Sequence, residues 1–165
     1  MGRGAGGAGA GHTAGADPVP DLLAAVDPRH YLGSGQMSIR VLVAGLGNMG
    51  RSHALAYHNH PGFEIVGLVN RSRPTLDPSL SGYAIQPDFE AALRELKPDL
   101  VSINTYSDSH ADYAVAALEQ GAHVFVEKPL ATTVADAERV VAAARANNRK
   151  LVVGYILRHH PSWVR

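Results

Sequence analysis

The sequence predicts an α/β protein whose parallel sheet of about six strands is doubly wound, with helices on both faces. Short apolar runs alternate with helical stretches from residue 39 to residue 155. The first run, residues 39–44, is almost entirely apolar, which is typical of a strand buried on both faces. Alternation at this spacing implies right-handed crossovers between parallel strands. Another open α/β fold with a different strand order fits the same pattern.

Each element has its own signal. The expected strands are short apolar runs at residues 39–44, 63–69, 83–85, 100–104, 122–126 and 151–155. Helical spacing predicts helices over residues 48–58, 89–96 and 108–120, and a fourth that reaches residue 147. We expect Asp88 to cap the second helix, Thr133 and Asp136 to cap the fourth, and Gly121 to end the third. Residues 71–82, broken by Pro and Gly, are expected to form a loop.

The first 36 residues differ from the rest. They begin with a stretch that is mostly Gly and Ala and shows no hydrophobic periodicity. Such a stretch buries too little apolar area to offset its ordering entropy, so we expect a flexible tail over residues 1–36. Residues 37–156 are the expected nucleotide-binding domain, and residues 157–165 the expected start of a substrate domain that is missing. Met37 directly precedes the first strand, so we hypothesise that translation starts there.

Composition narrows the class of protein. The formal net charge is zero, which disfavours nucleic-acid and anionic-membrane partners. The chain has no cysteine, which excludes disulfides, thiolate metal sites and a cysteine nucleophile. It has no apolar run that would span a bilayer, and its Gly-rich start leads us to expect no secretory signal; we expect a cytoplasmic protein with no membrane partner. We expect no metal site, because the adjacent His159 and His160 would point in different directions.

A glycine-rich turn joins the first strand to the first helix. The segment Gly45, Leu46, Gly47, Asn48, Met49 and Gly50 is a G-x-G-x-x-G motif. Gly45 is expected to permit the tight turn, Gly47 to let the backbone approach a pyrophosphate, and Gly50 to let the helix pack on the strand. The amino end of the helix then offers free N–H groups and a positive dipole to phosphates. This context predicts a Rossmann-type dinucleotide site, with a merely structural turn as the alternative. No Gly-Lys-Ser/Thr follows, which excludes a P-loop.

The residues after the second strand bear on which dinucleotide binds. An acidic residue there binds the adenosine ribose of NAD, whereas arginine accommodates the extra phosphate of NADP. This chain has Asn70, Arg71 and Arg73 and no carboxylate. Asn70 can hydrogen-bond a ribose, and either arginine can hold a phosphate in a bidentate fork. We therefore expect NAD(P), with a preference for NADP; the alternative is two solvated arginines. The missing carboxylate also disfavours a methyltransferase that uses the same loop.

Glu127, Lys128 and Pro129 end the fifth strand, at the sheet edge where α/β folds bind ligands. A lysine there can donate a proton or polarise a hydroxyl. Pro129 fixes the turn and is a candidate for a cis peptide. The alternative is a Glu–Lys surface pair.

These motifs resemble the Gfo/Idh/MocA family of oxidoreductases, which carries the glycine-rich turn first and Glu-Lys-Pro after the fifth strand. The resemblance covers residues 39–163. A third element agrees, since residues 105–110 resemble the family's Thr-Pro-Asn-x-x-His turn. Thr105 and His110 match that turn, whereas Tyr106 replaces Pro and Ser107 replaces Asn. Ser107 can still cap the helix, and His110 either contacts the cofactor or packs in the helix.

The resemblance implies hydride transfer between a nicotinamide cofactor and a sugar, inositol or related polyol. It implies that Glu127 contacts the nicotinamide ribose or carboxamide, and that Lys128 is catalytic and binds the reacting hydroxyl or carbonyl. Arg158 matches a family arginine that borders the substrate cleft. We expect the chain alone to be weakly active or inactive, and any homo-oligomer to depend on the missing domain. A non-catalytic dinucleotide-binding or regulatory module is the alternative.

Overall fold

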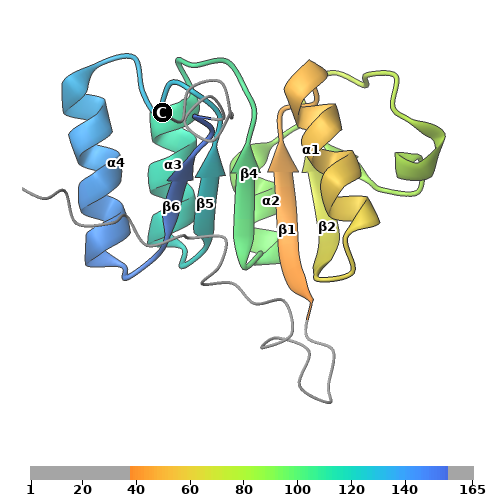
Figure 1. Cartoon of the computed structure of the whole chain (residues 1–165), viewed down its shortest axis with the longest axis horizontal. Coiled ribbons are helices and arrows are strands. Elements are labelled where there is room, and N and C mark those ends of the chain that lie inside the picture. The colour runs from red at the N-terminus through yellow and green to blue at the C-terminus, as the bar shows by residue number, and fades with distance from the viewer. Residues whose placement is uncertain (1–37, 156–165) are drawn as a thin grey trace, which may run out of the picture.

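The computed structural model describes residues 38–155, which form one sheet with helices on both faces (Figure 1). The strands are β1 Ile39–Ala44, β2 Phe63–Val69, β3 Ile85–Gln86, β4 Leu100–Ile103, β5 His123–Val126 and β6 Leu151–Val153. The helices are α1 Asn48–Asn59, α2 Phe89–Leu96, α3 His110–Glu119 and α4 Val134–Ala146, with a short 3₁₀ helix, η1, at Pro78–Leu80. Outside the described residues lie the expected tail over residues 1–36 and also Met37, Arg158, His159 and His160.

The six strands are parallel and lie in the order β3-β2-β1-β4-β5-β6. This is the strand order of the doubly wound dinucleotide-binding fold. The alternative strand orders left open by the pattern are therefore excluded. The order reverses between β1 and β4, which pair from Val41↔Leu100 to Ala44↔Ile103. In folds of this type, ligands bind outside the carboxyl ends of the strands at that point.

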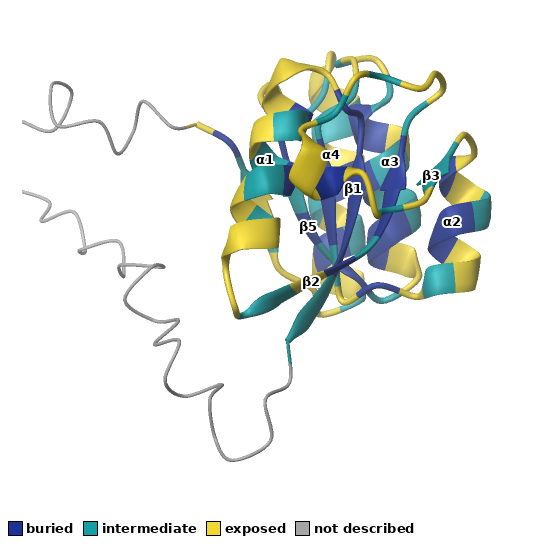
Figure 2. Cartoon of the chain, turned by 90° about the vertical axis from the view of Figure 1, so that its right-hand side faces the viewer, coloured by how far each residue is buried: buried dark blue, intermediate teal, exposed yellow. Residues whose placement is uncertain are grey.

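Two apolar clusters hold the helices to the sheet. On one face α2, α3 and α4 pack on the strands through residues such as Leu93, Leu118 and Val140. On the other face α1 and η1 pack through Ala54 and Leu80. Figure 2 shows the result, with strand residues buried and the outer sides of the helices exposed. On that face α1 and η1 lie over β1 to β3, and α1 reaches β5 through the packing of His53 on Phe125.

The structure confirms β1 and β2 and corrects several other boundaries. The third strand was expected at residues 83–85 but is Ile85–Gln86, because Tyr83 instead packs on the α1 side with its hydroxyl 3.0 Å from Nδ1 of His58. The sixth strand ends at Val153 and not at residue 155, because its partner β5 ends at Val126. The third helix begins at residue 110 and not at residue 108. The expected loop over residues 71–82 contains η1.

The side-chain caps expected for α2 and α4 are confirmed. Asp88 accepts a hydrogen bond from the N–H of Ala91 at 2.9 Å, and Thr133 accepts one from Asp136 at 3.1 Å. Gly121 follows α3 with φ +87°, in the left-handed region that glycine adopts without strain. Ser107 does not cap α3, whose N-cap is Ser109. Within residues 38–155, each helix is too short or too polar to cross a bilayer.

Candidate functional site

A cleft of about 530 Å³ opens at the carboxyl ends of β1, β2 and β4. The predicted site residues that line it are Gly45, Leu46, Gly47, Asn70, Arg71, Thr105 and Tyr106. Residues that the sequence had not indicated also line it: Val69, Ser72, Pro74, Pro87, Asn104, Asp108, Ser109 and Tyr113. The glycine-rich turn, the end of β2 and the loop after β4 therefore meet around one space, as the strand order requires.

Two of the three glycines in the turn are required by the fold itself. Gly45 has φ +85°, and a Cβ there would lie 2.6 Å from the backbone of Asn104. A Cβ on Gly50 would lie 1.7 Å from the carbonyl oxygen of Gly45. The turn can therefore be this tight, and α1 can start this close to it, only without side chains at these positions.

Gly47 is different. It has an extended backbone with φ −68°, and a Cβ there would meet nothing within 4 Å. Neither strain nor packing in this chain requires a glycine at this position. A glycine here leaves the backbone open to a group in the cleft.

The amino end of α1 keeps its N–H groups free. Its N-cap, Gly47, has no side chain to cap it, and the first turn contains no acidic residue. Among the helices of residues 38–155, α1 differs in this from the others, which have a side-chain cap, an acidic first-turn residue or both. The helix therefore presents unpartnered donors and the positive end of its dipole to the cleft, which suits a phosphate. Asn48 and Met49 are exposed there.

Asn70 fixes the turn against the end of β2. Its side-chain oxygen accepts a hydrogen bond from the N–H of Leu46 at 2.9 Å, and its amide donates to the carbonyl of Ser72 at 2.8 Å. The side-chain oxygen has a second lone pair. The structure thus gives Asn70 a role within the protein, in addition to the ribose contact expected from sequence.

Arg71 and Tyr106 face each other across the cleft. The guanidinium carbon lies 6.0 Å from the centre of the Tyr106 ring, at the edge of cation–π range. Both residues are exposed and line the cleft. Arg73 is exposed and is not among the lining residues.

The loop after β4 uses its residues in two ways. Thr105 and Ser109 line the cleft and are joined by a 2.8 Å hydrogen bond between their hydroxyls. His110 is 1% exposed, with Nδ1 2.7 Å from the carbonyl of Pro129 and Nε2 3.0 Å from that of Thr105. It therefore joins this loop to the Glu-Lys-Pro turn and does not line the cleft. Ser107 does not line it either.

Glu127 and Lys128 follow β5 at the same edge of the sheet. The Lys128–Pro129 peptide is cis, and the Lys128 side chain is exposed. Glu127 is buried, and the backbone N–H of Lys128 lies 3.3 Å from its Oε2. Its Oε1 lies 3.1 Å from Nε2 of His53, on α1. That distance is typical of an ion pair, but Oε1 has no well-aligned hydrogen-bond donor.

Asn104 also has a buried acceptor without a donor. Its amide donates to the carbonyl and hydroxyl oxygens of Ser102, both at 3.1 Å, which leaves its side-chain oxygen unpaired. Two such acceptors, on Asn104 and Glu127, thus follow neighbouring strands. Buried acceptors normally have a donor, so this edge fits a ligand with hydroxyl or amide N–H groups, such as a nicotinamide nucleotide. Motif reasoning from the sequence does not identify Asn104 as a site residue. The signal that could have found it is its position directly after the apolar strand β4, at the ligand-binding edge of the sheet.

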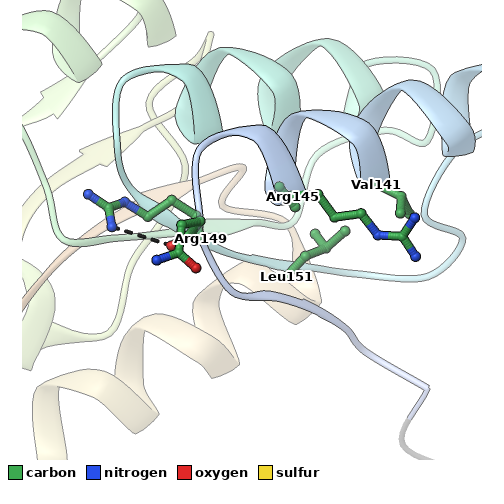
Figure 3. Close-up of a pocket in the computed structure, with 6 residues that line it drawn as sticks. Val141, Arg145, Arg149 and Leu151 are labelled. Carbon is green, nitrogen blue, oxygen red and sulfur yellow. Dashed lines mark hydrogen bonds between the residues drawn. The ribbon is translucent and has the colours of Figure 1, made fainter.

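A second hollow, of about 490 Å³, lies elsewhere on the molecule. It is formed at the carboxyl end of α4 and the start of β6, where Arg145 and Arg149 flank Val141 and Leu151 (Figure 3). Its arginines are exposed, and it shares no residue with the cleft at the glycine-rich turn. No residue that the sequence predicts to be catalytic or ligand-binding lines this hollow.

Comparison with known proteins gives the same family that the motifs resemble. A model of an oxidoreductase family with an NAD-binding Rossmann fold, Gfo/Idh/MocA, matches residues 39–155. Inositol 2-dehydrogenase of Salmonella typhimurium is 31% identical over 134 residues, which are 78% of this chain and 40% of that protein. A 4-carboxy-2-hydroxymuconate-6-semialdehyde dehydrogenase of Sphingobium is 32% identical over 127 residues, 75% of this chain and 40% of that protein.

Solved structures of dehydrogenases contain the same fold. UDP-N-acetylglucosamine 3-dehydrogenase of Acidithiobacillus ferrooxidans superposes with a TM-score of 0.67 at 27% identity, over 77% of this chain and 42% of that one. The chain thus spans about 40% of the length of the curated relatives it matches. The family model, the strand order and the glycine-rich turn together show that this chain belongs to the Gfo/Idh/MocA oxidoreductase family and contains its NAD-binding Rossmann domain.

Proposed function

We propose that this chain is the cofactor-binding part of an NAD(P)-dependent oxidoreductase that moves a hydride to or from a sugar, inositol or related polyol. The observation that carries the proposal is the open space over Gly47, at the uncapped amino end of α1. Gly45 and Gly50 are explained by the fold, whereas the glycine at position 47 is explained by a group that lies against the backbone. A diphosphate is the group that suits free N–H donors and a helix dipole.

The remaining site residues then take distinct parts. Backbone N–H groups of residues 47–50 bind the pyrophosphate, while Thr105 and Tyr106, which line the cleft, border the cofactor on the β4 side. Glu127 accepts hydrogen bonds from the nicotinamide ribose or carboxamide. The bound nicotinamide supplies or accepts the hydride. Lys128, exposed at the same edge, binds the reacting oxygen and moves its proton.

For the cofactor we propose a preference for NADP over NAD. No carboxylate follows β2, and Arg71 and Ser72 line the cleft there. An arginine fork and a hydroxyl suit a 2′-phosphate, which a carboxylate would repel. Arg73 is a weaker candidate for this contact, because it does not line the cleft.

A titration with NADPH and NADH tests both the site and the preference. We expect NADPH to bind more tightly, and Arg71→Ala to weaken NADPH binding by about tenfold or more, the usual worth of a charged hydrogen bond, while NADH binding changes little. Arg73→Ala is the matched control. Equal loss for both cofactors would contradict the 2′-phosphate contact, and no binding of either would contradict the proposed function.

The substrate class rests on the relatives and on Lys128. One relative is named for inositol and another for a muconate semialdehyde, so the family model by itself does not fix the substrate. Most of each relative's length has no counterpart in this chain, and we propose that a further domain, after residue 156, selects the substrate. In an enzyme that contains this domain, we expect Lys128→Ala to lower turnover of a polyol about a hundredfold. Unchanged turnover would remove Lys128 from the mechanism, and cofactor binding without any hydride transfer would favour a non-catalytic module.

A further inference from the structure

A row of polar side chains runs behind the Glu-Lys-Pro turn, on the face of the sheet that α1 covers. His53 lies in the second turn of α1, with its Nε2 3.1 Å from Oε1 of Glu127. The two side chains are 18% and 10% exposed. Gly154 closes the other side, since a Cβ there would lie 3.1–3.2 Å from the carboxylate. The carboxylate is thus confined between a helix and the segment that follows β6.

The row continues into the sheet. Nδ1 of His53 lies 3.5 Å from the hydroxyl of Ser102, which is fully buried on β4. The Asn104 amide lies 3.1 Å from that hydroxyl. The backbone of Asn104 forms the wall against which Gly45 packs. The row therefore runs from the Glu-Lys-Pro turn back to the glycine-rich turn.

The polar contacts in this row can be followed from donor to acceptor, starting at Asn104 and ending at Glu127. The Asn104 amide is a donor, so the Ser102 oxygen accepts from it. The Ser102 proton then has two acceptors within reach, Nδ1 of His53 at 3.5 Å and the Tyr57 hydroxyl. When that proton points at His53, Nδ1 is an acceptor and the ring proton is on Nε2, the nitrogen that faces Glu127. The His53 Nε2 thus lies 3.1 Å from a buried carboxylate oxygen that has no aligned hydrogen-bond donor in the described structure.

We propose that His53 is a positioning residue, which holds the Glu127 carboxylate in the orientation that receives the nicotinamide half of the cofactor. The inference rests on the proposed function, because it requires that half to lie at Glu127. A flexible carboxylate loses binding energy when it is fixed, and a donor that fixes it beforehand reduces that loss. His53 acts through Glu127 and does not itself contact the cofactor.

A purely structural role is the competing explanation. The His53 ring also packs on Phe125, with the ring centres 5.0 Å apart, and on Tyr57, at 6.4 Å. The two roles need different properties of the side chain. Packing needs a ring, whereas positioning needs an N–H at the place of Nε2.

Two substitutions separate these roles. His53→Phe keeps a ring of similar size and removes the donor, and His53→Gln keeps an N–H that reaches Glu127 and removes the ring. The ligands are NADH and ADP, which share the adenosine diphosphate and differ in the nicotinamide half. Affinities are measured by calorimetry on the chain as it is, with thermal unfolding as a check on folding.

We expect His53→Phe to weaken NADH binding about tenfold, the loss typical of a hydrogen bond to a charged group, and to leave ADP binding within about twofold. We expect His53→Gln to bind NADH nearly as the wild type does. The opposite order, with Phe tolerated and Gln harmful, would overturn the proposal, as would equal losses of NADH and ADP affinity. Failure of the wild-type chain to bind any of NADH, ADP and NADPH would instead contradict the proposed function.

Nitrogen NMR of the imidazole gives a second readout that packing does not determine. We expect the His53 ring to carry its proton on Nε2, with Nδ1 shifted as a hydrogen-bond acceptor, and Ser102→Ala to remove that acceptor shift. A ring protonated on Nδ1 would overturn the proposal.

Discussion

At the scale of single residues, the glycine-rich turn shows that three identical residues serve different purposes. Gly45 and Gly50 are fixed by backbone contacts of 2.6 Å and 1.7 Å that any Cβ would make. Gly47 makes no such contact. Gly47 can therefore be replaced without disturbing the fold, and a substitution there tests ligand binding separately from folding.

We predict that Gly47→Val folds but no longer binds a dinucleotide. Valine fits the extended backbone at this position, and we expect a loss of at most about 1 kcal/mol in the free energy of unfolding, from the poorer helix cap. Its side chain fills the space assigned to the pyrophosphate. Fluorescence titration with NADPH measures binding, and circular dichroism measures folding. Retained binding would contradict the placement of the pyrophosphate; Gly50→Val, which clashes with the turn, is expected to unfold.

His123 on β5 gives a prediction on pH. Burial, together with the nearby charges of Arg149 and Lys150, lowers the pKa of His123 below its ordinary value of 6.5. The backbone N–H of Lys150 also donates to its Nδ1 at 3.0 Å, a bond that protonation of that nitrogen removes. The unfolded chain therefore binds this proton more readily, so stability falls as pH drops through 6.5 and levels off below the folded pKa.

The substitution His123→Asn tests this assignment, because it keeps an acceptor near Nδ1 and removes the titration. We expect the loss of stability between about pH 7 and pH 5, measured by denaturant unfolding, to become smaller in this variant. An unchanged pH dependence would show that other groups cause it.

At the scale of elements, the helices differ in how their amino ends are satisfied. α2 and α4 are capped by Asp88 and Thr133. α1, which faces the cleft, has no side-chain cap. α2 and α4 thus close donors of their own, whereas α1 and α3, whose N-caps Gly47 and Ser109 line the cleft, have no side-chain cap. Of these two, α1 also lacks an acidic residue in its first turn.

We predict that Thr133→Ala lowers the free energy of unfolding by about 1 kcal/mol, because it removes the acceptor for the N–H of Asp136. Thr132→Ala, the same substitution at the exposed neighbouring position, is the matched control and should change stability little. Urea denaturation measures both. Equal effects of the two substitutions would mean that the cap contributes nothing.

At the scale of the whole molecule, the strand order decides where the site lies. The reversal between β1 and β4 brings together three segments that are far apart in the chain, the turns after β1, β2 and β4. The cleft exists only while the sheet is intact. Cofactor binding and folding are therefore linked.

We predict that a dinucleotide raises the thermal midpoint of the wild-type chain in proportion to the logarithm of its concentration. At about one hundred times the dissociation constant the expected stabilisation is about 2.7 kcal/mol, or a shift of roughly 10 °C for a domain of this size. Differential scanning calorimetry measures it. Gly47→Val should show no shift, and a shift of equal size in that variant would place the binding elsewhere.

Local chemistry determined much of this protein from the sequence. β1, β2, the glycine-rich turn and the caps at Asp88 and Thr133 were all predicted, because hydrophobic period, backbone freedom and capping act over a few residues. The Gfo/Idh/MocA resemblance rested on motifs of the same short range, and the family match confirms it.

Contacts between distant segments were decided by the tertiary structure. The strand order, the burial of His110 and the unpaired acceptor of Asn104 have no signature within their own segments. His53 and Glu127 meet only because α1 crosses the face of the sheet on which the end of β5 lies. Periodicity tells which side of an element is buried but not which other element covers it, and the packing of the folded chain supplies that answer.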